Sequence, residues 1–119
     1  MTLAGLAPST RTVPGLVLSV SSDGGVALLT LRGEADFATE AVLVEALDRV
    51  VADHNGDVAV DLSAADFIDS ATVRALGRAG QRLSDSSRTL TLRSPSTLAL
   101  RILTLHGLSH LVEQGGSPH

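Results

Sequence analysis

Apolar residues along the chain follow two kinds of pattern: short aliphatic runs, and longer stretches in which they recur every three or four positions. The runs at residues 16–20 and 26–31 are β-prone and are separated by the turn sequence Asp23-Gly24-Gly25. Because Asp-Gly and Gly-Gly supply the positive φ angles of a tight turn, the pattern predicts a β-hairpin over residues 16–32.

A first helix is predicted over residues 40–53, where the aliphatic side chains share one side and the charged ones lie elsewhere. Asp36 or Thr39 is placed to cap its N-terminus. Asn55-Gly56 is expected to end it, because glycine suits the left-handed position that follows a helix.

A short, mainly aliphatic strand is predicted at Val58 to Leu62, and such a run is typical of a central strand buried on both faces. Residues 63–69 are expected to form a polar loop. A second helix is then predicted over residues 70–83. Gly77 and Gly80 lie on its apolar face, which predicts close packing onto the sheet that offsets their low helix propensity.

The C-terminal third contains a half-buried strand at residues 89–93 and a third helix at about 96–105. Ser94 is the expected N-cap of that helix, with Pro95 at the first helical position. Residues 108–112 form either a last strand or a final helical turn.

Strands that alternate with helices imply crossover connections, so the fold class is α/β, with a mixed sheet of about four to five strands and helices packed on it. The length of 119 residues fits one domain. We expect that domain over residues 15–114, between a flexible N-terminal arm at 1–14 and a flexible tail at 115–119.

Composition excludes several classes of function. The net charge is −4, and the basic residues are all arginine and form no run, which disfavours nucleic acid as a partner. The absence of cysteine excludes disulfides and thiol chemistry. No apolar stretch approaches the roughly 18 to 20 residues needed to cross a membrane, and the start of the chain does not resemble a signal peptide. We therefore expect a cytoplasmic protein that does not bind a membrane.

Catalytic constellations are not apparent. His106 and His110 have no acidic cluster nearby to complete a metal site. Ser70 lies in no Gly-x-Ser-x-Gly elbow, and no histidine is close to it in sequence. We expect no catalytic residue, no metal and no cofactor, and hence a protein that is not an enzyme.

The most informative segment is residues 60–72, in which a buried strand leads through a short loop into a helix. Asp69, Ser70 and Thr72 stand at the start of that helix, where free N–H groups and the helix dipole favour negative charge. These residues serve either as ordinary helix caps or as a site for an anion, including a phosphate carried on a side chain.

Two motifs in this chain resemble those of STAS domains, and in particular of bacterial anti-sigma factor antagonists. The first is Asp61-Leu62-Ser63 followed by Phe67-Ile68-Asp69-Ser70, and the second is Gly33-Glu34-Ala35-Asp36 after the second strand. The spacing of the motifs and the order of elements also fit, and the resemblance covers about residues 15–114.

The resemblance implies partner switching. In that family the unphosphorylated domain binds an anti-sigma factor that is also a kinase of the histidine-kinase-like ATPase type, and so frees a sigma factor. Phosphorylation of a Ser or Thr at the start of the second helix releases the domain, and a phosphatase reverses the mark.

Carried over by position, Ser70 matches the hydroxyl residue after the motif's aspartate, Asp69. The chain reads Asp-Ser-Ala-Thr where Asp-Ser-Ser-Gly or Asp-Ser-Thr-Gly is usual. Ala71 therefore removes one acceptor used in some members. Ser70 is the first candidate acceptor and Thr72 the second, and an antagonist that is always active is the alternative.

The resemblance places partner contacts on this helix and the loops beside it. The residues implied are Glu34, Asp36, Asp66, Asp69, Ser70, Arg74 and Arg78. Arg74, Arg78 and Arg82 recur every four residues and form a basic stripe, which is either a solvated face or a contact surface.

A second function class stays open at this stage. A STAS domain also serves as a small-ligand or nucleotide sensor, or as a subunit of a transporter-linked complex. Both classes would use the same surface.

Overall fold

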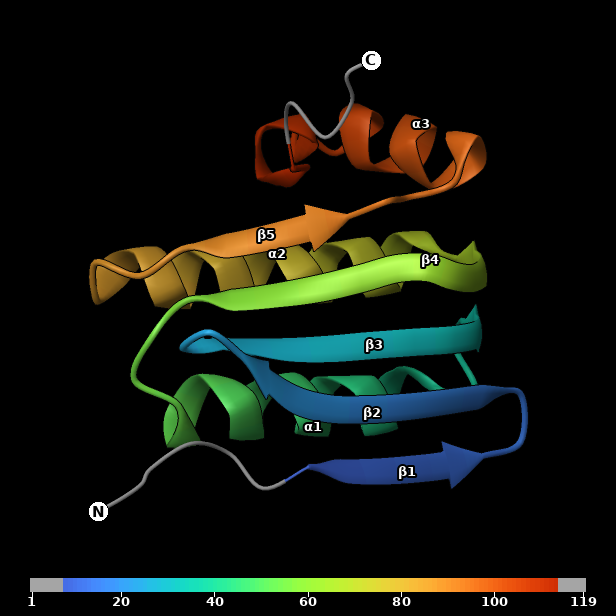
Figure 1. Cartoon of the computed structure of the whole chain (residues 1–119). Coiled ribbons are helices and arrows are strands. Elements are labelled where there is room, and N and C mark those ends of the chain that lie inside the picture. Colours follow the sequence, from blue (N-terminus) through green and yellow to red (C-terminus); the bar gives the residue numbers. More distant parts are fainter. Residues whose placement is uncertain (1–7, 114–119) are drawn as a thin grey trace.

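The computed structural model describes residues 8–113, in which five strands form one mixed sheet, in chain order β1-β2-β3-β4-β5 (Figure 1). The strands are β1 Ser9–Val13, β2 Leu16–Asp23, β3 Val26–Ala35, β4 Val58–Ile68 and β5 Leu90–Arg93. The helices are α1 Glu40–Asp53, α2 Ser70–Asp85, α3 Thr97–Leu105 and the short 3-10 turn η1 Ser109–Leu111. The predicted α/β class and mixed sheet are confirmed.

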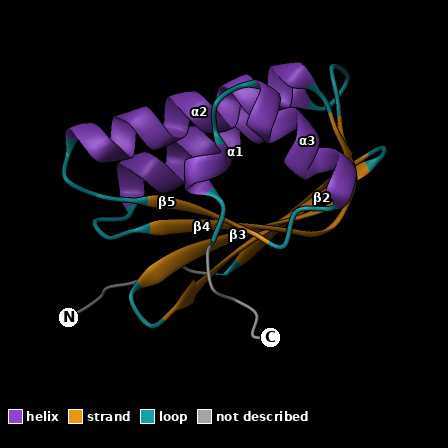
Figure 2. Ribbon diagram, turned by 90° about the horizontal axis from the view of Figure 1, so that it is seen from above, coloured by secondary structure: helices purple, strands orange, loops and turns teal. Residues whose placement is uncertain are grey.

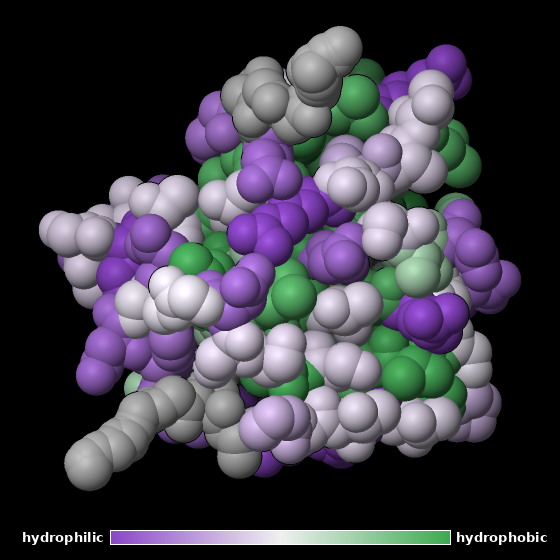
Figure 3. All heavy atoms as spheres, viewed as in Figure 1, coloured by the Kyte–Doolittle hydropathy of each residue, from purple (hydrophilic) through white to green (hydrophobic). Residues whose placement is uncertain are grey.

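The two long helices lie on the same face of the sheet (Figure 2). β1, β2 and β3 are antiparallel neighbours, whereas β3, β4 and β5 run parallel. Each parallel connection steps to the next strand in the same direction, so right-handed crossovers put both α1 and α2 on one side. Within residues 8–113 no helix covers the opposite face, on which hydrophilic and hydrophobic residues are interspersed (Figure 3).

The predicted hairpin is confirmed, and its pairing extends one residue beyond the predicted range. Leu16 pairs with Gly33 at one end and Asp23 with Val26 at the other. Gly24 and Gly25 form the turn with φ angles of 59° and 88°, which glycine adopts without steric strain.

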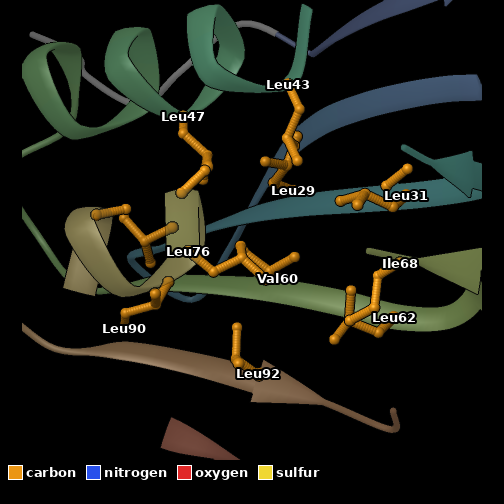
Figure 4. Close-up of a cluster of buried hydrophobic side chains, with 14 of the residues drawn as sticks. Leu29, Leu31, Leu43, Leu47, Val60, Leu62, Ile68, Leu76, Leu90 and Leu92 are labelled. Atoms are coloured by element: carbon orange, nitrogen blue, oxygen red, sulfur yellow. The ribbon is translucent and has the colours of Figure 1, made fainter. Parts of the chain in front are cut away.

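The core lies between the sheet and the two long helices. Leucines of α1 and α2 point at the aliphatic residues of the central strands (Figure 4). Leu43, Leu76, Leu29 and Val60 are each 0% exposed. Truncating one such leucine to alanine typically costs about 2–5 kcal/mol, so this layer holds the strand ends in fixed positions.

β4 is longer than predicted, and the expected loop at residues 63–69 is wrong. The strand continues to Ile68 and stays paired with β3 through two register shifts. At the first of these the Ser63 N–H donates to the Asp61 carboxylate at 2.8 Å. Because bulges break the alternation of apolar and polar residues, the sequence reads as a loop where the backbone is still a strand.

The expected flexible arm at residues 1–14 is wrong for Ser9–Val13, which forms the edge strand β1. Its residues are mostly exposed, so it lacks the alternating pattern by which a half-buried strand is recognised. Residues 1–7 and the predicted tail at 115–119 lie outside the described residues.

Two predicted helix ends are corrected. Gly56 does not adopt a positive φ, and α1 ends through an extended His54. A Cβ at Gly56 would instead lie 2.7 Å from the Gly25 carbonyl oxygen, so glycine is needed there for close approach to the hairpin turn. The N-cap of α3 is Ser96, whose hydroxyl accepts from the Ala99 N–H at 3.0 Å, whereas Ser94 has a φ of 54° before the helix begins.

The predicted packing of the α2 glycines onto the sheet holds for Gly80, where a Cβ would lie 3.5 Å from Leu90 of β5, but both glycines also pack against the C-terminal segment. A Cβ at Gly77 would lie 3.3 Å from Leu108, and one at Gly80 would lie 3.4 Å from Leu111. That segment contains both alternatives predicted for it: η1 is a helical turn, and Val112 then bridges to Leu92 of β5.

Candidate functional site

The candidate residues gather where β3 and β4 end. These strands are parallel, so their C-terminal ends meet at one edge of the sheet. Glu34 pairs with Phe67 and Ala35 with Ile68 in the last two register positions. The two sequence motifs, whose paired residues are 33 positions apart in the chain, are therefore side by side in the fold.

The Ala35 carbonyl oxygen joins the two motifs. It accepts from the Asp69 backbone N–H at 3.1 Å and from the Thr72 hydroxyl at 3.0 Å. Thr72 is 0% exposed. This pair of hydrogen bonds fixes the N-terminus of α2 against the end of β3.

Asp69 is the N-cap of α2, as one of the sequence-based interpretations held. Its carboxylate accepts from the Thr72 N–H at 2.9 Å. The cap satisfies one of the N–H groups that every helix start leaves free, and its charge lies favourably in the helix dipole.

Ser70 is the first residue of α2, and its side chain is exposed. Its hydroxyl forms no hydrogen bond within the described part of the chain. Thr72, two residues on, has its hydroxyl buried and committed to Ala35. Of the two candidate acceptors, only Ser70 is accessible to another protein in the folded state.

Gly33 opens the second motif with a φ of 109°, which L-residues rarely adopt. A Cβ there would lie 2.3 Å from the Gly15 carbonyl oxygen. That same oxygen accepts from the Glu34 N–H at 2.8 Å. The glycine therefore lets β3 approach the β1–β2 turn closely just before the site.

Thr39 occupies the N-cap position of α1, as one of the two predicted alternatives, but its side chain makes no capping hydrogen bond, and the side chains of Asp36 and Thr39 instead stabilise the β3–α1 turn. The Thr39 hydroxyl accepts from the Asp36 N–H at 2.9 Å and lies 3.1 Å from the Glu34 carbonyl oxygen, to which it donates. The Asp36 carboxylate accepts from the Ala38 N–H at 3.0 Å. Both polar residues are used to fix this turn next to Ser70.

The charged residues around the site are exposed: Glu34, Asp66, Arg74 and Arg78. The basic stripe is not uniform. Arg82 forms an ion pair of 2.6 Å with Asp48 across the two helices, whereas Arg74 and Arg78 form none within the described residues. The two free arginines are those nearer Ser70.

Sequence reasoning did not assign a role to the two phenylalanines, which are the only aromatic residues of the chain. Phe37, in the β3–α1 turn, is 84% exposed, and Phe67, near the end of β4, is 40% exposed. Both lie at the same end of the sheet as Ser70. Two features of the sequence could have indicated a role for them: aromatic residues are rare in this chain, and both phenylalanines lie in or beside the motifs.

A hollow of about 330 Å³ lies elsewhere, between β1, β2 and α1. Arg11, Glu45 and Arg49 line it, and Arg11 pairs with Glu45 at 2.7 Å. None of the predicted site residues lines this hollow. Among residues 8–113 no cluster of three His, Asp or Glu side chains suits a metal ion, and no helix is long and apolar enough to span a membrane.

Comparison with known proteins agrees with this geometry. The chain is 35% identical over 71 residues to the anti-sigma-F factor antagonist RsfB of Mycobacterium tuberculosis. The alignment covers 60% of this chain and spans 58% of the length of that relative.

Solved structures share the fold. An anti-sigma factor antagonist from Mycobacterium paratuberculosis is 26% identical, with a TM-score of 0.69 and coverage of 91% of this chain and 86% of that one. The Bacillus protein SpoIIAA in its phosphorylated form is 15% identical, with a TM-score of 0.64 and coverage of 90% and 89%. Residues 18–113 match the family described as "Mlab, STAS domain". The chain belongs to the STAS domain family.

Proposed function

We propose that the protein is an anti-sigma factor antagonist that is switched off by phosphorylation of Ser70. The observation that carries the proposal is the free, exposed hydroxyl of Ser70 at the start of α2. The sequence relative and the mycobacterial structure are both named as anti-sigma factor antagonists, which supports the same role.

The proposed partner is an anti-sigma factor of the histidine-kinase-like ATPase type. It would bind the unphosphorylated protein, release its sigma factor and phosphorylate Ser70, and a phosphatase would restore the binding form. The protein would act in the cytoplasm, because a sigma factor works with the transcription machinery. The protein acts in this scheme as ligand and substrate and catalyses no step, so it needs neither metal nor cofactor.

The surface around Ser70 has the features of a switch. Phosphorylation adds a charge of about −1.5 to −2 at neutral pH. The start of α2 accommodates that charge, because the helix dipole and the exposed Arg74 one turn away both favour it. At a packed interface the same charge, beside Asp66 and Asp69, must be desolvated or repelled. A stable phosphorylated domain and a broken complex are therefore compatible.

The departures from the usual motif, at positions 71 and 72, limit which residue can accept a phosphoryl group, but they leave Ser70 available. Ala71 offers no hydroxyl, and the hydroxyl of Thr72 is engaged with the Ala35 carbonyl. A kinase would reach Thr72 only after local unfolding of the first turn of α2. The proposal therefore assigns the acceptor role to Ser70 alone.

The test is affinity purification from an extract of the native host, with wild type, Ser70→Ala and Ser70→Glu compared side by side by mass spectrometry. We expect wild type and Ser70→Ala to retain a histidine-kinase-like ATPase and Ser70→Glu to lose it. If none of the three retains such a protein, the antagonist role is wrong, and a ligand-sensing role becomes the better account.

A further inference from the structure

A shallow groove runs between α1 and α2 and opens at the end of the molecule that carries Ser70. We define the α1–α2 groove by Phe37, Glu40, Ala41, Val44 and Arg78, which line a depression of about 680 Å³ together with Glu45 and Asp48. Val44, Asp48 and Arg78 also line a smaller depression farther along the same two helices. The groove therefore follows the helix pair.

Phe37 stands at the mouth of this groove with 84% of its surface exposed. A free aromatic ring of that size buries about 150–250 Å² when a partner covers it, and such rings are typical anchors of protein interfaces. The local fold keeps the ring outside, because the hydrogen bonds of Asp36 and Thr39 on either side of it fix the turn.

The walls of the groove carry opposite charges. Glu40 belongs to α1 and Arg78 to α2, and neither forms an ion pair within the described residues. Farther along, the ion pair of Arg82 with Asp48 joins the same two helices. The groove therefore fits a segment with an apolar side chain between two charged ones. The basic side chain of that segment would face Glu40, and the acidic one would face Arg78.

We infer that the α1–α2 groove binds an amphipathic segment of the anti-sigma factor, which inserts an apolar side chain against Phe37 and Val44 and places a carboxylate on Arg78. The inference rests on the proposed function and specifies its interface. Arg78 lies two turns from Ser70, about 12 Å along the helix axis, so one partner spans both. In this arrangement Phe37 lies inside the interface and Ser70 at its edge, where phosphorylation would add negative charge.

The test measures the affinity of the purified anti-sigma factor for variants of the intact protein by isothermal titration calorimetry. Phe37→Ala removes the ring, and Ala41→Glu places a charge on the groove floor while keeping a good helix former. Each is expected to weaken binding by about 10- to 100-fold. Leu105→Ala is the matched control, because Leu105 is 78% exposed at the end of α3 outside the groove.

Charge is tested with Arg78→Glu, expected to weaken binding by at least about tenfold through repulsion of the partner's carboxylate. Arg101→Glu on the exposed side of α3 is its control and should leave the affinity unchanged. Thermal melts of all variants should match wild type, because every substituted side chain is exposed at the surface.

The outcomes separate this inference from the proposed function. If wild type binds the anti-sigma factor and the groove variants bind as tightly, the groove is not the interface although the antagonist role stands. If wild type binds no anti-sigma factor, the proposed function fails first. If the groove variants change only self-association in sedimentation velocity runs, the occupant is a second copy of the chain, and the inference is overturned.

Discussion

The hydroxyl of Thr72 donates a 3.0 Å hydrogen bond to the backbone carbonyl of Ala35, 37 residues earlier in the chain. The bond is buried and joins the start of α2 to the end of β3. The two hydroxyl residues of the motif therefore differ in role: Thr72 stabilises the fold, whereas Ser70 is exposed to solvent. The residue that replaces the family's usual glycine thus has a structural use.

Thr72→Val tests this division. The substitution keeps the shape of the side chain and removes its donor, so the free energy of unfolding should fall by about 1 kcal/mol in urea denaturation. Phosphorylation by the anti-sigma factor should be unchanged. Loss of phosphorylation in a folded Thr72→Val protein would show that Thr72 is the acceptor.

Gly33→Ala should destabilise the protein severely. Its Cβ would overlap the Gly15 carbonyl oxygen, and its φ of 109° is strained for alanine, so we expect a loss above about 3 kcal/mol. Gly24→Ala is the control, because Gly24 has a φ of 59° with nothing within 4 Å, and its loss should be about 1–2 kcal/mol. Equal losses in chemical denaturation would contradict the close contact at Gly33.

Two substitutions of Asp69 distinguish its role as a helix cap from a role in partner binding. Asp69→Ala removes the acceptor for the Thr72 N–H and should cost about 1 kcal/mol of stability, whereas Asp69→Asn retains a good cap and should cost little. If the carboxylate also contacts the partner, Asp69→Asn will weaken binding without changing the melting temperature. Unchanged affinity in calorimetry would limit Asp69 to the cap.

Site mapping by peptide mass spectrometry, after incubation of the protein with its anti-sigma factor and Mg-ATP, addresses the acceptor directly. We expect one phosphoryl group, on Ser70, and none in Ser70→Ala. Modification of Ser70→Ala at any other hydroxyl would contradict the assignment.

Periodicity and turn chemistry were sufficient to predict the hairpin, α1 and α2, because each buries one face and therefore repeats its apolar residues. The motifs placed Ser70 and Asp69 correctly at the start of α2. The exposed edge strand β1 could not be found in this way, since its residues bury little surface. The second half of β4 was missed for a different reason, because its register shifts move the side chains out of alternation.

The details of the site depend on contacts between distant residues, which local sequence does not contain. The Ala35 carbonyl as a common acceptor became visible only when β3 and β4 were aligned in register. The exposure of Phe37 likewise depends on the turn that Asp36 and Thr39 fix, because an isolated phenylalanine in a sequence is most often a core residue.

The central claim is that this protein releases a sigma factor from its anti-sigma factor, and that the state of Ser70 decides whether it does so. A competition assay measures this directly, with a fluorescently labelled sigma factor held by the purified anti-sigma factor and the protein added in excess. The account predicts release by wild type and by Ser70→Ala, and none by Ser70→Glu at the same concentration. Retention of the sigma factor at saturating wild type, or equal release by Ser70→Glu, would contradict it.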